Sequence, residues 1–222
     1  MEFDTDIAIV GGGLNGNTLA LALAQTGQRV TLIDAPTGRI VGKSVKEYVV
    51  LRTKDDPLRA TQSHHDQMEA LVAAMTEAVA MTGAVGSDVK GVACATTGSS
   101  VIITDDTLTP VSDYYLWCDH RAYKEAEQIT QMGTDCGLEA LKYCGGKYSH
   151  EWGFAKLLHF LRNNPDLRSR ATLALENCDM IAATLCGVTH PDDLRRSTCS
   201  MGHKWMWNEA LGGYPSDTSF VA

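Results

Sequence analysis

The pattern that most constrains the fold lies near the N-terminus, where an apolar run leads into a glycine-rich loop and then into an apolar helix. Residues 7–10 predict a strand, and residues 14–25 predict a helix with apolar side chains on one face. The loop carries the three glycines of a Gly-x-Gly-x-x-Gly pattern: Gly11, Gly13 and Gly16. In a dinucleotide-binding unit the first permits a tight turn, the second lets the backbone approach a pyrophosphate, and the third lets the helix lie close to the strand. The pattern therefore predicts a Rossmann-like β-α-β unit with an anion site at the N-terminus of its helix.

The end of this segment supplies an acidic residue where such a unit needs one. Residues 29–33 predict a second strand, and Asp34 follows it directly. A carboxylate at that place accepts hydrogen bonds from a ribose hydroxyl. Residues 1–36 as a whole resemble the start of flavin-dependent monooxygenases of the ubiquinone-biosynthesis hydroxylase type, which implies FAD as a ligand. The alternative is a β-α-β unit whose glycines serve packing alone. Because a tight flavin site draws on contacts far beyond one such unit, we expect FAD binding to be weak or absent.

Composition and charge exclude several kinds of partner. The chain has 222 residues, of which 44% are hydrophobic and 21% charged, with a formal net charge of -8. This acidic balance disfavours a non-specific nucleic-acid binder or a basic membrane-surface protein. No apolar run approaches the ~20 residues of a membrane-spanning helix. The seven cysteines are odd in number and never spaced as Cys-x-x-Cys, which is typical of reduced thiols in a cytoplasmic protein. No cysteine and histidine quartet appears, so the sequence predicts no metal site.

The order of elements after residue 36 indicates an α/β protein. We expect strands at 39–50 and 89–97, a hairpin near 104–110, and helices at 61–81, 120–132, 150–163 and 175–185. The strand at 89–97 is expected to be buried, and Asp119 is expected to be the N-cap of the helix that follows it. Strands with interleaved helices, followed by a mainly helical second half, favour this fold class.

Seven blocks in this second part, taken in order, resemble the N-terminal lobe of FGGY-family carbohydrate kinases, and among them those of the L-ribulokinase type. The blocks are DAPTGRIVGKSVKEY, QSHHDQMEALVAAM, GVACATTGSS, WCDHRAYKEAEQI, GGKYSHEWGFAKLLHFLRNNPDL, ENCDMIAATLCGV and SMGHKWMWNEALGGYPS. The resemblance implies two ribonuclease-H-like, actin-like lobes with a mixed sheet, which bind a sugar and ATP with Mg²⁺ in the cleft between them. It divides the chain into a segment 1–36 and a kinase lobe 37–222.

The resemblance also implies which residues contact the sugar. It assigns the loop formed by Ala95, Thr96, Thr97 and Gly98, together with Lys204. Each has a plainer interpretation, because the threonines could simply end a buried strand and the lysine could be a surface side chain. Many relatives carry an aspartate in place of Ala95. The block from Trp117 to Arg121, which contains Asp119, is either architectural or part of the sugar pocket.

Two departures from the family weaken the prediction of kinase activity. The β-α-β segment stands where the family has its first phosphate-binding hairpin, and the family's catalytic aspartate and second lobe match nothing here. We therefore expect a fragment or fusion that is a poor kinase alone, with a second chain as a possible source of the missing lobe. The alternatives are an FAD- or NAD-binding oxidoreductase and a non-catalytic sugar- or nucleotide-binding module. The direction of the strand at 29–33 against that at 7–10 distinguishes them, because a helical crossover requires parallel strands and the kinase hairpin antiparallel ones.

Overall fold

The computed structural model describes residues 7–11 and 27–216. They form two compact units, the first made of 7–11, 27–50 and 62–97 and the second of 51–61 and 98–216. Each unit has its own sheet. No helix in the described part of the chain combines the length and the apolarity needed to cross a membrane.

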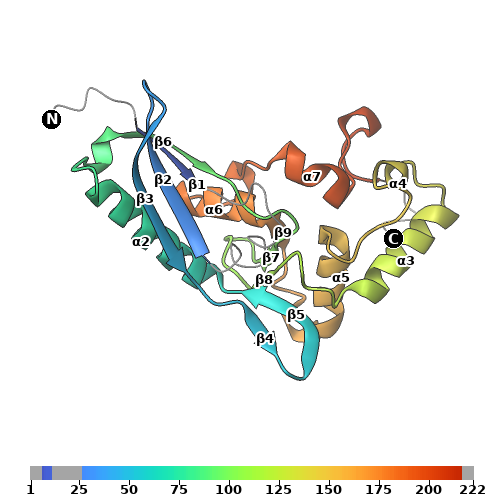
Figure 1. Ribbon diagram of the computed structural model, residues 1–222. Helices are drawn as coiled ribbons and strands as arrows, with labels where there is room; N and C mark the ends of the chain where they lie inside the picture. The colour runs from blue at the N-terminus through green and yellow to red at the C-terminus, as the bar shows by residue number, and fades with distance from the viewer. Residues whose placement is uncertain (1–6, 12–26, 217–222) are drawn as a thin grey trace. The chain divides into compact units, whose positions relative to one another are not determined.

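The first unit is a mixed sheet with one long helix on it. Its elements are β1 (Ile7–Gly11), β2 (Gly27–Asp34), β3 (Arg39–Glu47), α2 (His64–Ala80), the short helix η1 (Gly86–Asp88) and β6 (Val89–Cys94). The strand order is β3-β2-β1-β6, with β1 and β3 antiparallel to β2 and β6 parallel to β1. Helix α2 packs along β2 and β3 (Figure 1).

The pairing of β1 with β2 contradicts the predicted β-α-β unit. The two strands are antiparallel, with Ile7 opposite Asp34 and Gly11 opposite Val30. A parallel pair would place Gly11 and Asp34 at the same edge of the sheet, whereas this register places them at opposite ends of a five-residue strand, ~14 Å apart at 3.4 Å per residue. They cannot hold the phosphate and ribose of one dinucleotide. Gly13, Gly16 and the predicted helix at 14–25 lie outside the described residues.

Helix α2 begins and packs as its sequence dictates. The Ser63 side chain accepts a hydrogen bond from the Asp66 backbone N–H, which caps the helix. Its buried face consists mainly of small side chains, so the helix lies close to the sheet. At the closest point a Cβ on Gly42 of β3 would lie 2.2 Å from the carbonyl oxygen of Ala78, so only glycine fits there.

The second unit combines a small sheet with most of the helices. Its strands are β4 (Leu51–Thr53), β5 (Asp56–Gln62), β7 (Val101–Thr104), β8 (Tyr114–Tyr115) and β9 (Leu173–Glu176), in the order β4-β5-β8-β7-β9. Its helices are α3 (Tyr123–Asp135), α4 (Ala140–Tyr143), α5 (Gly153–Asn163), α6 (Asn177–Leu185) and α7 (Thr198–Trp205), with short helices η2 (Pro165–Leu167), η3 (Pro191–Asp193) and η4 (Glu209–Leu211). Strand β7, which lies between β8 and β9, is fully buried and pairs antiparallel with β9.

Three local expectations were wrong. Strand β6 is mostly exposed, because it is the edge strand of the first sheet. Leu175 lies in β9, and the helix predicted at 175–185 begins only at Asn177, because the preceding residues pair with β7. Asp119 does not cap α3, whose N-cap is Ala122. The carboxylate of Asp119 is buried instead.

Candidate functional site

The residues assigned to the sugar lie where β6 leads into β7. Ala95 is exposed and Thr96 and Thr97 are half-buried at the end of the first unit, while Gly98 begins the second unit. Lys204, on α7, belongs to that second unit too. A Cβ built on Gly98 would lie 1.8 Å from Lys204 Nζ, so the absence of a side chain at 98 lets the amino group lie against this loop. The structure thus brings together two of the five residues within one unit.

The next residue of the loop, Ser99, is held in an unusual conformation by two buried charged side chains. Its φ of 68° lies in the left-handed region, which costs a non-glycine residue ~1 kcal/mol. Its backbone N–H donates to Glu176 Oε2 at 2.9 Å, and its carbonyl oxygen accepts from Lys156 Nζ at 2.5 Å. Both backbone polar groups of Ser99 are therefore satisfied in this conformation, which fixes the loop beside Gly98. We call the place where Gly98, Ser99 and Lys204 meet the corner.

Lys156 is a fully buried cation in the second unit. Its Nζ donates to three backbone carbonyls, those of Ser99, Tyr115 and Leu116, at 2.5, 3.3 and 2.7 Å. Burial lowers the pKa of Lys156 to about 8, although the nearby carboxylate of Glu176 opposes this shift. The group thus ties the loop, strand β8 and helix α5 together through one side chain.

Glu176 is the buried carboxylate that joins the loop to α7. Its Oε1 accepts a hydrogen bond from Trp205 Nε1 at 3.0 Å. Burial raises the pKa of Glu176, while that hydrogen bond and the positive charges of Lys204 and Lys156 oppose the rise. The residue therefore joins Ser99 of the loop to Trp205 of α7 and interacts electrostatically with Lys204.

The backbone of α7 is fixed by tight contacts with α5 and the loop before it. The Tyr148 hydroxyl donates to the carbonyl oxygen of Lys204 and accepts from the Phe154 backbone N–H at 3.1 Å. A Cβ on Gly153 would lie 2.0 Å from the Trp205 ring, so α5 must begin with glycine for the indole to pack there. These contacts hold the segment that presents the Lys204 side chain.

Sequence reasoning missed Lys156 and Glu176, although the first left a signal. Lys156 lies three residues after Gly153 and four before Phe160, and these three residues share the buried face of α5. A lysine at that place in an apolar pattern indicates a buried cation that needs partners. Nothing local marks Glu176, whose partners Ser99 and Trp205 are distant in sequence.

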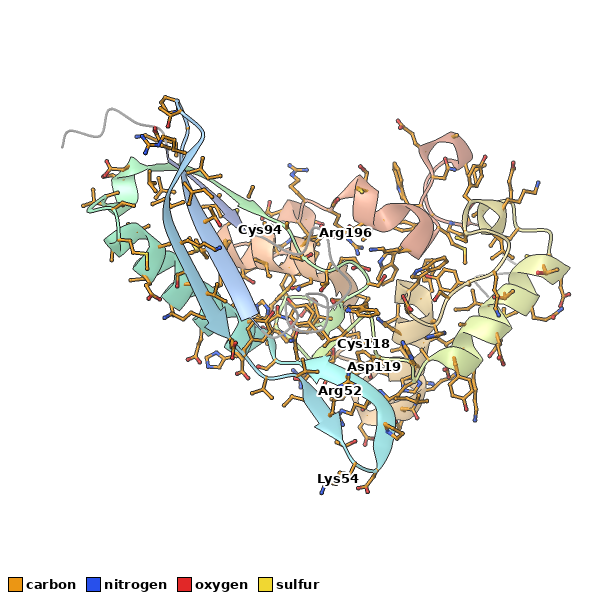
Figure 2. The ribbon with its side chains drawn as sticks, viewed as in Figure 1. Arg52, Lys54, Cys94, Cys118, Asp119 and Arg196 are labelled. Carbon is orange, nitrogen blue, oxygen red and sulfur yellow. The ribbon has the colours of Figure 1, made fainter. Side chains whose placement is uncertain are left out.

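The block around Asp119 serves the architecture of the second unit. Asp119 is buried, accepts from the Ala60 N–H at 3.0 Å, and forms an ion pair with Arg121 in which Oδ2 lies 2.7 Å from Nη2. Arg121 in turn lies 4.6 Å from the centroid of the Tyr115 ring. These contacts tie the segment before α3 to the β4–β5 hairpin. Arg52 of that hairpin also donates a hydrogen bond to Cys118, the residue before Asp119 (Figure 2).

A separate hollow of about 600 Å³ lies on the helices of the second unit. Its lining is mostly apolar and comes largely from α3 and α5. Gly98 and Lys204 are not part of that lining. Since a sugar needs polar partners, this hollow does not suit one.

Comparison with known proteins identifies the family. The model of the N-terminal domain of the FGGY family of carbohydrate kinases matches residues 18–203. The chain belongs to this family. The match begins inside the segment that the glycine pattern assigned to a dinucleotide-binding unit, and nothing in the comparisons supports the flavin resemblance or FAD.

The chain matches only part of the length of its relatives of known function. The chain is 30% identical to a ribulokinase of Vibrio parahaemolyticus, over 93% of this chain and 39% of the relative. It is 27% identical to a ribulokinase of Bacillus licheniformis, over 87% of this chain and 38% of the relative. The chain therefore spans about two fifths of the length of these relatives.

Solved structures confirm the predicted mixed α/β fold of actin-like sugar kinases. The xylulose kinase of Bifidobacterium adolescentis matches 95% of this chain with a TM-score of 0.66 and 15% identity, over 40% of its own chain. A Plasmodium falciparum glycerol kinase with ADP matches 93% of this chain with a TM-score of 0.57 and 14% identity, over 42% of its own chain. At these identities the likeness shows the fold alone.

Proposed function

We propose that this chain is the sugar-contacting N-terminal part of a ribulokinase-type kinase, which transfers a phosphoryl group from ATP to a ketopentose such as L-ribulose. The observation that carries the proposal is the corner where Lys204 Nζ lies against Gly98, backed by buried Glu176. Both relatives described above are named ribulokinases, and the family resemblance assigns this lysine and this loop to the sugar.

The chemistry of the corner suits a polyhydroxylated ligand. The Lys204 ammonium has three N–H donors for hydroxyl or carbonyl oxygens. Thr96 and Thr97 precede Gly98 directly, and their hydroxyls both donate and accept. Ala95 is exposed and small, so it leaves room beside the loop. We therefore assign Ala95, Thr96, Thr97, Gly98 and Lys204 to sugar binding.

In this proposal, phosphoryl transfer requires the second lobe of the kinase in addition to the residues of this chain. Membership of the FGGY family implies the use of ATP and Mg²⁺. Among the described residues, the one cluster of three metal-donor side chains contains two histidines, and Mg²⁺ prefers oxygen ligands, so these residues do not fit that ion. No residue here is assigned as the base that takes the proton from the sugar hydroxyl. We expect negligible phosphorylation by this chain alone, with the second lobe supplied by the rest of a longer chain or by a second chain.

Thermal unfolding with and without ketopentoses tests the sugar site. L-ribulose should raise the melting temperature of the unaltered chain, and Lys204→Ala should abolish the rise. Gly98→Ala should do the same, because its Cβ displaces Lys204 Nζ, whereas Gly91→Ala, which meets no atom within 4 Å, should leave the rise intact. An equal rise in the Lys204→Ala variant would exclude this site.

ADP release tests the second part of the proposal. The chain alone should release no ADP in response to L-ribulose. Sugar-dependent release that Lys204→Ala abolishes would show a competent kinase with a base that we have not assigned. Sugar binding without ADP release in a protein that has both lobes would favour a non-catalytic sugar-binding module.

A further inference from the structure

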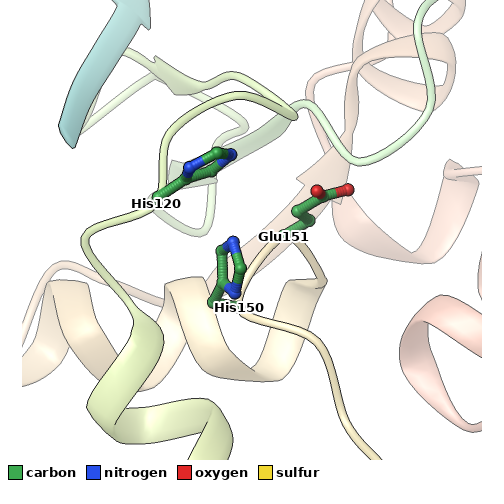
Figure 3. A group of neighbouring side chains, drawn as sticks. All are labelled: His120, His150 and Glu151. Atoms are coloured by element: carbon green, nitrogen blue, oxygen red, sulfur yellow. The ribbon is translucent and has the colours of Figure 1, made fainter.

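Two histidines and a glutamate come together in the second unit, outside the sugar corner. His120 lies between β8 and α3, and His150 and Glu151 lie in the turn before α5. One potential donor atom from each residue lies within 4.8 Å of the other two. The two imidazole rings have centroids 4.7 Å apart and meet at 75°, and Figure 3 shows the two segments that bring the three side chains together.

The donor atoms of this cluster lack partners in the described structure. The Nε2 atoms of His120 and His150 are buried, and no described atom forms a hydrogen bond with either. Glu151 forms no salt bridge with any described residue, as judged by N–O distances up to 4.0 Å. Buried polar atoms without partners cost free energy. A bound cation would satisfy both nitrogens and the carboxylate at once.

The backbone on both sides of the cluster is anchored. The His120 backbone N–H donates to the carbonyl oxygen of Leu58 in β5 at 3.0 Å. On the other side the Tyr148 backbone N–H, in the segment that leads to His150, donates to Thr130 Oγ1 of α3 at 2.9 Å. The side chains therefore approach each other from two segments with hydrogen-bonded backbones, and their donor atoms must move closer together to reach the ligand distances of ~2.0–2.2 Å that zinc requires.

We propose that His120, His150 and Glu151 bind Zn²⁺ or a similar divalent transition-metal ion. Two imidazole nitrogens and one carboxylate oxygen are a donor set that suits zinc and its first-row neighbours, and it does not suit Mg²⁺ or Ca²⁺. Three protein ligands leave a fourth position for water. Because the ligands come from the segments before α3 and before α5, the ion cross-links these two helices within one unit.

Metal titration of the chelator-treated chain tests the site, with Co²⁺ and Zn²⁺ as the probes. Calorimetry should show one Zn²⁺ per chain, and His150→Asn and Glu151→Gln should each weaken binding at least about 100-fold. His65→Asn is the matched control, because this exposed histidine pairs with Glu69 on the surface of α2 and should leave binding unchanged. Circular dichroism of the metal-free variants should match that of the unaltered chain, which would show that they remain folded.

The Co²⁺ spectrum separates this site from binding by cysteines. Cys118 is two residues from His120, and a thiolate ligand would produce a near-ultraviolet charge-transfer band. We expect visible bands of a four-coordinate Co²⁺ site without that band, and excess Mg²⁺ should not remove them. Absence of binding, a thiolate band, or affinity that His150→Asn and Glu151→Gln leave unchanged would each overturn the proposal.

Discussion

Replacing Lys156 by methionine tests whether the buried cation holds the second unit together. The substitution keeps a side chain of similar length, so the cavity is small, but it removes all three hydrogen bonds to the carbonyls of Ser99, Tyr115 and Leu116. It also leaves Glu176 with Lys204 as its remaining positive neighbour.

The expected loss of stability is large. Removing one partner of a buried charged network typically costs about 3–5 kcal/mol, because the groups left behind stay buried without partners. In a chain of this size, 1 kcal/mol corresponds to roughly 2–4 °C in melting temperature, so the melting temperature should fall by roughly 10 °C. Urea unfolding followed by tryptophan fluorescence measures the loss. Lys54→Met, on the exposed turn of the β4–β5 hairpin (Figure 2), is the control and should change stability by less than about 0.5 kcal/mol. An equal, small effect of both substitutions would refute the reasoning.

The pH dependence of the same comparison gives a second, independent check. In the folded chain Lys156 loses its proton near a pKa of about 8, whereas in the unfolded chain it keeps the proton up to its ordinary pKa of 10.5. Between these values the unfolded state binds more protons, so the free energy of unfolding rises with pH by up to about 1.4 kcal/mol per unit. The deficit of Lys156→Met relative to the unaltered chain should therefore widen from pH 8 to pH 10. A deficit that narrows over this range would contradict the assigned burial of the cation.

Two glycine substitutions test the close contacts in each unit. Gly42→Ala should destabilise the first unit by about 1–3 kcal/mol, because its Cβ meets the rigid backbone of Ala78 and pushes α2 off the sheet, which urea unfolding would detect. Gly153→Ala should cost a similar amount in the second unit and change the fluorescence of Trp205, whose ring occupies the space of the new Cβ. Gly91→Ala has open space around it and should leave both signals unchanged; an effect equal to those of the other two would show that steric contact is not the cause.

The sequence predicted the regular elements where their pattern is local. The spacing of apolar residues in α2 and the serine before it specify that helix without any distant contact. Strand direction was not predictable in the same way, because an apolar run followed by Gly11 is compatible with a parallel or an antiparallel partner. The direction shows only in the pairing of β1 with both β2 and β6, and β6 lies far from β1 along the chain.

The candidate site was predicted to the extent that motifs matched the family. The family blocks name Gly98 and Lys204, and the structure places those two residues together, whereas their role in sugar binding stays a prediction. The role of Asp119 was missed, because a polar residue before a helix favours a cap by local rules alone. Its partner is the backbone N–H of Ala60 in the β4–β5 hairpin, which is distant in sequence, so no local pattern could reveal the contact.

The loop at Ser99 depends on residues that are distant in sequence, and this determines when during folding the loop and Lys204 come together. Ser99 adopts a left-handed conformation that costs free energy by itself, and the groups that stabilise it come from α5 and from the end of β9. Since Lys156 and Glu176 are costly to bury unless all their hydrogen bonds are made, the network is stable only when the second unit is complete. The loop and Lys204 should therefore come together with the folding of that whole unit and not before. A peptide that contains only the loop lacks both buried partners, so by this argument it has no means of presenting the corner to a sugar.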